Sequence, residues 1–325
     1  MPATCVATIG NFDGVHIGHA ALVRRAREMA GGGRVVALGF DPHPASVLAP
    51  GSEPQRLTTF EERAGLLRAA GADEVVRLEP SAALLGLGPD EFLGGVVERH
   101  GVTAIVEGHD FHFGKARAGT PRTLVEFGRT RGIDVVIVPP VEVELCDQTL
   151  VRAASSMVRW LLERGRVTDA HRVLGRPFSL RGTVVRNDQR GRTIGFPTAN
   201  LDPATLGGVM VPGDGVYVGL AALPDGERLP AAVHIGPRPT FNAAASVVET
   251  HVIGWGGPPA GGAEYGWTLG VHLLAHLREL VRFDGPSALA AQIGRDRDRA
   301  LRIASWYLRA GGVAAPVALP EEVRS

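Results

Sequence analysis

The chain has 325 residues, enough for two domains that each bury a core of their own. Its 34 basic residues balance 34 acidic ones, so neither a nucleic acid nor a membrane surface finds an electrostatic match. A hydrophobic content of 45% and a charged content of 21% are those of an ordinary globular protein.

The two cysteines, Cys5 and Cys146, are too few for a disulfide framework or a thiolate metal site. The start of the chain lacks a basic segment followed by an apolar core, and no apolar run reaches about 18 residues. The sequence therefore predicts neither a signal peptide nor a membrane span, and we expect a cytoplasmic protein.

In the first half of the chain, short apolar runs typical of strands alternate with segments of helical periodicity. This alternation predicts an α/β domain with parallel strands, joined by right-handed helical crossovers into a doubly wound sheet. Such sheets bind ligands at the carboxyl ends of their strands, so we expect chemical residues in the loops that follow strands. The expected strands are 6–9, 35–40, 74–78, 104–106 and 135–138, and helices are expected to begin near Ala20, Phe60, Pro89 and Thr123.

The loop after the first expected strand reads Gly-Asn-Phe-Asp-Gly-Val-His-Ile-Gly-His over residues 10–19. Glycines let the backbone approach a ligand closely, and the helix that follows offers unpaired N–H groups to an anion. His16 and His19 are three residues apart, so both imidazoles can face that anion and stabilise charge on a phosphate in a transition state. On spacing alone, two surface histidines or a pair of metal ligands are the alternatives.

Three later segments suit a nucleotide or a planar ring. Phe-Asp-Pro-His-Pro follows the second strand, and its prolines hold His43 in a defined direction, although a plain rigid turn is the alternative. Residues 108–114, Gly-His-Asp-Phe-His-Phe-Gly, place two aromatic rings among glycines, either for a ligand or to fill the core. Residues 154–159, Ala-Ser-Ser-Met-Val-Arg, open a helix with N-capping serines and an arginine that can hold phosphate in a bidentate fork.

From about residue 178 the pattern changes to short β-like runs with Gly, Pro and Asp turns, which predicts a small antiparallel barrel. Residues 285–309 have the periodicity of an amphipathic helix, and we expect the tail from Gly311 to be poorly ordered. Thr198 and Asn200, within Gly-Arg-Thr-Ile-Gly-Phe-Pro-Thr-Ala-Asn, supply hard oxygen donors suited to Mg²⁺ that carries nucleotide phosphates. The expected strands are 179–185, 215–222, 229–235, 246–253 and 268–274.

Together these motifs resemble one family. Residues 10–19 resemble the His-x-Gly-His signature of the nucleotidyltransferase superfamily, and the whole set, in order and spacing, resembles the bacterial bifunctional riboflavin kinase/FMN adenylyltransferases, or FAD synthetases. The resemblance implies a Rossmann-like adenylyltransferase domain over residues 1–175. It implies a riboflavin kinase β-barrel with a C-terminal helix over residues 176–310, and a tail over 311–325.

The resemblance also implies two successive reactions. The barrel converts riboflavin and ATP to FMN and ADP, and the N-terminal domain converts FMN and ATP to FAD and pyrophosphate. His16 and His19 are the implied catalytic residues of the second reaction, and Glu249 is the implied base of the first. Mg²⁺ enters with ATP; the other implied partners are riboflavin, FMN and FAD, and the oligomeric state stays open.

The other implied site residues form four groups. In the adenylyltransferase, ATP and its phosphates are bound by Gly10, Asn11, Phe12, Asp13, Gly14, Ser155, Ser156 and Arg159, and the flavin or adenine lies near His43, Asp110, Phe111, Phe113 and Gly114. In the kinase, ATP is bound by Gly182, Arg190, Gly191, Arg192, Gly195 and Pro197, and Mg-ATP by Thr198 and Asn200.

The chain departs from the family pattern in both halves. In the first, Ala154 replaces a serine, Ser156 a threonine and Val158 an isoleucine. In the second, Asn187 replaces a glycine of the phosphate loop, His234 stands where the family has asparagine, and the loop over residues 254–262 is atypical. Asn187 and His234 motivate one alternative, a monofunctional FMN adenylyltransferase with a degenerate flavin-binding barrel. A non-catalytic flavin sensor is an alternative of another kind. An aminoacyl-tRNA ligase, which also uses His-x-Gly-His, is disfavoured by the zero net charge and the lack of a Lys-Met-Ser-Lys-Ser-like loop.

Overall fold

The computed structural model describes residues 4–186, 191, 195–237, 246–257 and 263–311. The chain divides into two compact units, Met1–Val143 with Arg152–Ser155 and Glu144–Val151 with Ser156–Ser325. This division falls at the start of helix α7 (Ser155–Glu163), whereas the predicted domain boundary follows helix α8 (Val167–Leu174). That residues 1–175 carry the adenylyltransferase and residues 176–310 the kinase stays a prediction.

The first unit contains a five-stranded parallel sheet with the order β3-β2-β1-β4-β5, which confirms the doubly wound fold. From β1 the chain adds strands first on one side and then on the other, so the topological switch point lies between β1 and β4. The strands are β1 (Cys5–Gly10), β2 (Arg34–Phe40), β3 (Glu74–Leu78), β4 (Ala104–Gly108) and β5 (Asp134–Val138).

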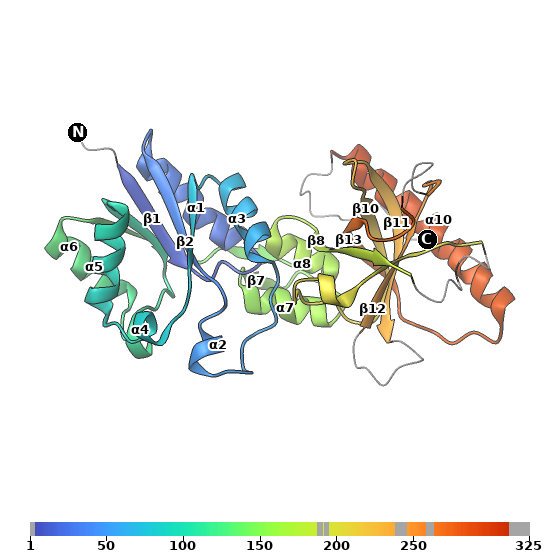
Figure 1. The fold of residues 1–325 in the computed structure, drawn as a ribbon. Helices are drawn as coiled ribbons and strands as arrows, with labels where there is room; N and C mark the ends of the chain where they lie inside the picture. Colours follow the sequence, from blue (N-terminus) through green and yellow to red (C-terminus); the bar gives the residue numbers. More distant parts are fainter. Residues whose placement is uncertain (1–3, 187–190, 192–194, 238–245, 258–262, 312–325) are drawn as a thin grey trace. The chain divides into compact units, whose positions relative to one another are not determined.

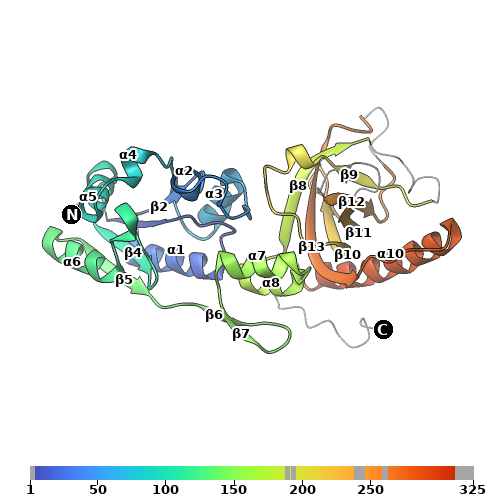
Figure 2. The ribbon, with the colours of Figure 1, turned by 90° about the horizontal axis from the view of Figure 1, so that it is seen from below.

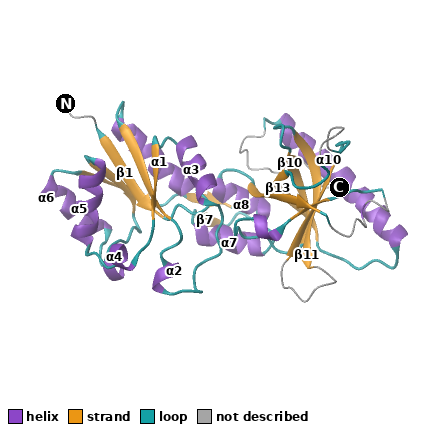
Figure 3. Ribbon diagram, in the orientation of Figure 1, coloured by secondary structure: helices purple, strands orange, loops and turns teal. Residues whose placement is uncertain are grey.

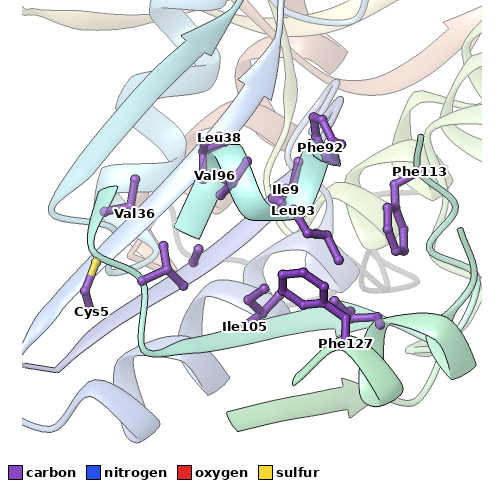
Figure 4. Packing of buried hydrophobic residues seen from close by; sticks show 13 residues of the cluster. Cys5, Ile9, Val36, Leu38, Phe92, Leu93, Val96, Ile105, Phe113 and Phe127 are labelled. Carbon is purple, nitrogen blue, oxygen red and sulfur yellow. The ribbon is translucent and has the colours of Figure 1, made fainter. Parts of the chain in front are cut away.

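Helices cover both faces of this sheet, because alternate residues of each buried strand point to opposite sides. On one face Val6 and Val35 pack with residues of α1 and α3, and on the other Ile9 and Leu38 pack with residues of α5 and α6. Figure 1 shows the two helix pairs, and Figure 4 shows the second layer of packing. The helices are α1 (Ile17–Ala30), α2 (Ala45–Leu48), α3 (Phe60–Ala69), α4 (Ala82–Leu85), α5 (Pro89–His100) and α6 (Pro121–Arg131).

A short hairpin was not predicted. β6 (Glu142–Glu144) and β7 (Leu150–Arg152) form a two-stranded sheet, visible in Figure 2. Each strand has three residues, too few for an alternating pattern to stand out in the sequence.

The second unit contains a closed barrel with the order β10-β11-β12-β9-β8-β13, in which neighbouring strands are antiparallel (Figure 3). This confirms the predicted barrel; its shortest strand, β9, was not among the expected runs. The strands are β8 (Phe178–Val185), β9 (Ala199–Leu201), β10 (Gly215–Ala222), β11 (Arg228–Pro237), β12 (Ser246–Val252) and β13 (Thr268–Arg278).

The predicted amphipathic helix is α10 (Pro286–Arg309). Its buried residues Ala300, Ile303 and Tyr307 pack against apolar residues of the barrel strands. Within the described residues, no helix is both long enough and apolar enough to cross a membrane. The tail from residue 312 lies outside the described residues.

Candidate active sites

The loop from β1 to α1 is a tight and strained turn. Gly14 has φ +79°, and the two non-glycine residues Phe12 and Val15 have φ +49° and +40°. Such values are rare for a bulky residue and for a β-branched one, and they cluster at functional sites. The turn persists because the Phe12 ring is buried and the amide of Val15 donates to the carbonyl oxygen of Phe12 at 3.0 Å.

His16 and His19 lie together at the start of α1. His16 caps the helix, and its Nδ1 accepts a hydrogen bond from the amide of His19 at 3.4 Å. The two rings are stacked with centroids 3.6 Å apart. Gly18 makes this possible, because a Cβ there would lie only 3.0 Å from the Nδ1 of His16. Since Nδ1 accepts, Nε2 carries the proton of the neutral His16 ring and can donate to a ligand.

The same helix end is suited to an anion. The first turn of α1 contains no acidic side chain, so its N–H groups and the macrodipole are not already neutralised by a carboxylate. Ser155 reaches the same loop, because its Oγ donates to the carbonyl oxygen of Asp13 at 2.7 Å. Ser156 and Arg159 belong to the second compact unit, and their contact with ATP stays a prediction.

The Asp13 side chain is turned into the protein and holds a neighbouring segment. Its carboxylate accepts from the amide of Leu57 at 2.9 Å and from the amide and hydroxyl of Thr58 at 3.1 and 3.2 Å. It is 6% exposed, and Arg63 lies 3.9 Å away. This geometry makes Asp13 an anchor of the loop, so what it can offer ATP is main chain rather than carboxylate.

Arg63 of α3 links the loops after β1 and β2, a role that the sequence analysis missed. It is 4% exposed, donates to the carbonyl oxygen of Phe40 at 2.8 Å and lies 3.8 Å from Asp41. Burial lowers its pKa, while Asp13 and Asp41 oppose that shift. A charged residue in the apolar stripe of a helix is the sequence signal that points to such a buried pair.

His43 and Asn11 bring the first two loops together. The Nδ2 of Asn11 lies 3.2 Å from the Nε2 of His43, and the Nδ1 of His43 accepts from the amide of Ala45 at 3.1 Å. Because Nδ1 accepts, Nε2 carries the proton of the neutral ring and prefers an oxygen partner. Rotating the Asn11 side-chain amide by 180° exchanges its Oδ1 and Nδ2, so that Oδ1 accepts from the Nε2–H of His43 and the NH₂ group points away from the ring.

The aromatic loop after β4 divides into a core residue and a more exposed one. Phe113 is 5% exposed and belongs to the core cluster with Phe92, as the core-filling alternative predicts. Phe111 is half-buried and stacks on Phe113 at 5.0 Å, so it is the ring available to a planar ligand. Gly114 has φ +70°, and a Cβ there would lie 2.9 Å from the Pro89 nitrogen. Asp110 is exposed.

In the barrel, the segment before β9 is held by β12. The Nδ1–H of His251 donates to the carbonyl oxygen of Pro197 at 2.8 Å. The amide of Phe196 donates to the carbonyl oxygen of Gly191. Residue 191 must be a glycine for this contact, because a Cβ there would lie only 2.3 Å from the carbonyl oxygen of Phe196. Gly195 has φ +84°. Arg190, Arg192 and the departure Asn187 lie outside the described residues.

The predicted base and the predicted metal ligand face each other across two strands. Glu249 of β12 pairs with Asn200 of β9 on one side and with His234 of β11 on the other. The Nδ2 of Asn200 lies 3.5 Å from the Oγ1 of Thr198. Directly opposed residues have Cβ atoms about 5 Å apart, so these polar side chains form one row. Burial lowers the pKa of His234, while Glu249 opposes that shift.

The row can serve a nucleotide that arrives with its metal. Hydroxyl and amide oxygens are hard donors that suit Mg²⁺ shared with phosphates. No cluster of three His, Cys, Asp or Glu side chains fit to hold a metal occurs in the part of the chain that the structure describes. The hydroxyl of Thr198 and the side-chain amide of Asn200 are oxygen donors of the kind that such a cation takes. At Gly182, in β8, a Cβ would lie 3.0 Å from the Cδ2 of Leu206, so a larger residue there would require the Leu206 side chain to shift.

Comparison with known proteins agrees with both halves of this description. Residues 1–149 match the FAD synthetase family, and residues 174–304 match the riboflavin kinase family. A Streptococcus pneumoniae structure described as a macrolide-efflux protein is 30% identical, with a TM-score of 0.81, and covers 93% of this chain and 95% of its own.

Curated relatives extend the match over nearly the whole chain. The bifunctional riboflavin kinase/FMN adenylyltransferases of Escherichia coli and Pseudomonas fluorescens are each 35% identical and cover 90% of this chain and 90% of their own. That of Bacillus subtilis is 29% identical over 92% of both chains. With two matched domains and relatives of this similarity over 90% of their length, the chain belongs to the bifunctional riboflavin kinase/FMN adenylyltransferase family.

Proposed function

We propose that the two compact units divide the two steps of flavin cofactor synthesis. The barrel transfers the γ-phosphoryl group of ATP to riboflavin, and the β1–α1 loop transfers AMP from a second ATP to the FMN so formed. The observation that carries the assignment of the second step is the stacked pair His16–His19, held at the N-terminus of α1 by a strained loop. Because both steps consume ATP, we place the protein in the cytoplasm.

In adenylyl transfer, an oxygen of the FMN phosphate attacks the α-phosphorus of ATP and pyrophosphate leaves. The attacking phosphate is already ionised near neutral pH, so no strong base is needed. The Nε2–H of His16, His19 and the N–H groups of α1 stabilise the charge that grows on the α-phosphate. Asn11, steadied by His43, orients this phosphate.

In riboflavin phosphorylation, the terminal ribityl hydroxyl attacks the γ-phosphorus and ADP leaves. Glu249 takes the hydroxyl proton, and Thr198 and Asn200 position Mg-ATP beside it. Positioning and metal charge provide most of the rate enhancement in such transfers. His234, half-buried and opposite Glu249, gives the carboxylate a polar neighbour rather than an apolar one.

The test is a chromatographic time course with riboflavin, ATP and Mg²⁺, comparing the wild type with one variant in each unit. His19→Ala should accumulate FMN and lose FAD by about a hundredfold or more. Glu249→Gln should leave riboflavin unphosphorylated, with a loss of the same order, yet convert added FMN to FAD at the wild-type rate. Each variant is thus the other's control.

Two outcomes contradict the assignment. If the wild type ignores riboflavin but adenylates added FMN, the barrel is degenerate and the protein is monofunctional. If it binds FMN without consuming ATP in either assay, it is a flavin sensor.

A further inference from the structure

A buried carboxyl group stands at the switch point of the parallel sheet. β1 and β4 pair at Val6–Ala104 and Ala7–Ile105 and then part, whereas β1 stays paired with β2 as far as Gly10–Gly39. The amide of Ile9 faces the side from which β4 has withdrawn. It donates to the Oε1 of Glu107, at 2.5 Å, instead of to a main-chain carbonyl.

Glu107 has almost no contact with water. It is 1% exposed and Ile9 is 2% exposed, and no cation forms an ion pair with Glu107 among the residues described here. Burial raises the pKa of this carboxyl well above its ordinary value, and the amides of Ile9 and Gly108 only partly oppose the shift. The carboxyl meets the buried N–H of Ile9 inside the core, where the cost of burying a charge disfavours its ionised form.

The place of this contact gives it a role. Ile9 stands two residues before Asn11 and three before Phe12, where the backbone first enters the left-handed region. An apolar side chain at 107 would leave a buried N–H without an acceptor, and the end of β1 would shift to find one. The side chain of Glu107 reaches across the gap that a ladder bond would close.

We propose that Glu107 is a positioning residue of the adenylyl-transfer site: its carboxyl replaces the missing ladder bond, keeps β1 and β4 apart at the switch point, and fixes the main chain from which the histidine loop starts. This inference rests on the proposed role of that loop. Glu107 acts through Ile9 and Asn11 and does not touch the substrate.

Two substitutions of similar size test whether the hydrogen-bond acceptor at residue 107 matters, or only the volume of its side chain. Glu107→Gln keeps a carbonyl oxygen for Ile9, whereas Glu107→Leu removes it. We expect Glu107→Gln to retain FMN adenylylation within about twofold, and Glu107→Leu to lower kcat by about tenfold or more, with smaller changes in KM. Riboflavin phosphorylation by the same molecules should be unchanged, because it occurs in the other unit.

Amide hydrogen exchange provides an independent measurement. The Ile9 amide should be protected in the wild type and in Glu107→Gln and should exchange faster in Glu107→Leu, while Ala7 stays protected. If Glu107→Leu does not fold, Glu107→Asp replaces it, since withdrawing the acceptor by one methylene should have the same effect.

The proposal is overturned if the Leu and Asp variants adenylate FMN at the wild-type rate, or if Glu107→Gln loses as much as they do. A wild type that does not adenylate FMN refutes the proposed function instead. In that case the exchange of Ile9 still tests the contact with Glu107.

Discussion

Replacing Asp13 by alanine tests whether this residue anchors the histidine loop or binds ATP. The carboxylate is 6% exposed and accepts from the Leu57 amide and from the amide and hydroxyl of Thr58. It also faces the buried Arg63 at 3.9 Å. Asp13→Ala leaves two buried N–H groups without an acceptor and removes one of the two carboxylates beside the guanidinium.

Each orphaned buried N–H costs about 1–3 kcal/mol. Losing one of its two distant carboxylates makes the burial of Arg63 costlier, because Asp41 alone remains at 3.8 Å. We therefore expect the free energy of unfolding of the first unit to fall by about 3–5 kcal/mol. Glu28→Ala is the matched control in the same unit: its ion pair with Arg25 is exposed, and its loss should cost less than about 0.5 kcal/mol.

Urea unfolding followed by two probes separates the units. The four tryptophans, Trp160, Trp255, Trp267 and Trp306, all belong to the second unit, so their fluorescence should not change in Asp13→Ala. Far-UV circular dichroism should show an earlier transition for the first unit. A loss below about 1 kcal/mol together with a large rise in KM for ATP would refute the anchoring role and make Asp13 a ligand contact.

Two further predictions concern stability. Burial lowers the pKa of His272 and that of His171 to about 4, so the unfolded chain takes up protons first. Each neutral imidazole therefore stabilises the folded state fully above about pH 6.5, and this contribution is lost as the pH falls towards 4. The free energy of unfolding should fall by about 2 kcal/mol per imidazole between about pH 7 and 5. The tryptophan-detected urea midpoint should follow this loss, and a slope against pH that is the same in His272→Gln would contradict it. Gly114→Ala should destabilise the first unit by about 1–3 kcal/mol more than Gly101→Ala: both glycines have left-handed φ, but only at 114 would the Cβ meet the backbone of Pro89. Equal losses in urea unfolding followed by circular dichroism would show that this contact relaxes.

The regular elements could be predicted because their signals are local. β3 and β10 have the predicted bounds, and α3 and α5 begin at the predicted residues. The expected helix near Ala20 begins earlier, at Ile17, because His16 caps it. Such a cap depends on how the loop folds back, which periodicity does not record.

The sites were predictable only in part. The motif at residues 10–19 indicates an anion site, and the structure brings its two histidines together. Asp13 and Phe113 belong to motifs too, yet their side chains point into the protein and hold it together. A motif records which residues occur together and not which of them face the ligand.

The sequence by itself determined the order of elements and the change from parallel sheet to barrel, and its motifs predict phosphate chemistry after β1 and before β9. These follow from local backbone preferences and from side-chain periods of 3.6 and 2 residues. Only the tertiary structure decided that Arg63 joins two loops, that Glu249 stands between Asn200 and His234, and that Glu107 replaces a strand-to-strand bond. Each of these depends on residues brought together from distant parts of the chain, and their hydrogen bonds and charges are decided by burial, which is a property of the folded chain.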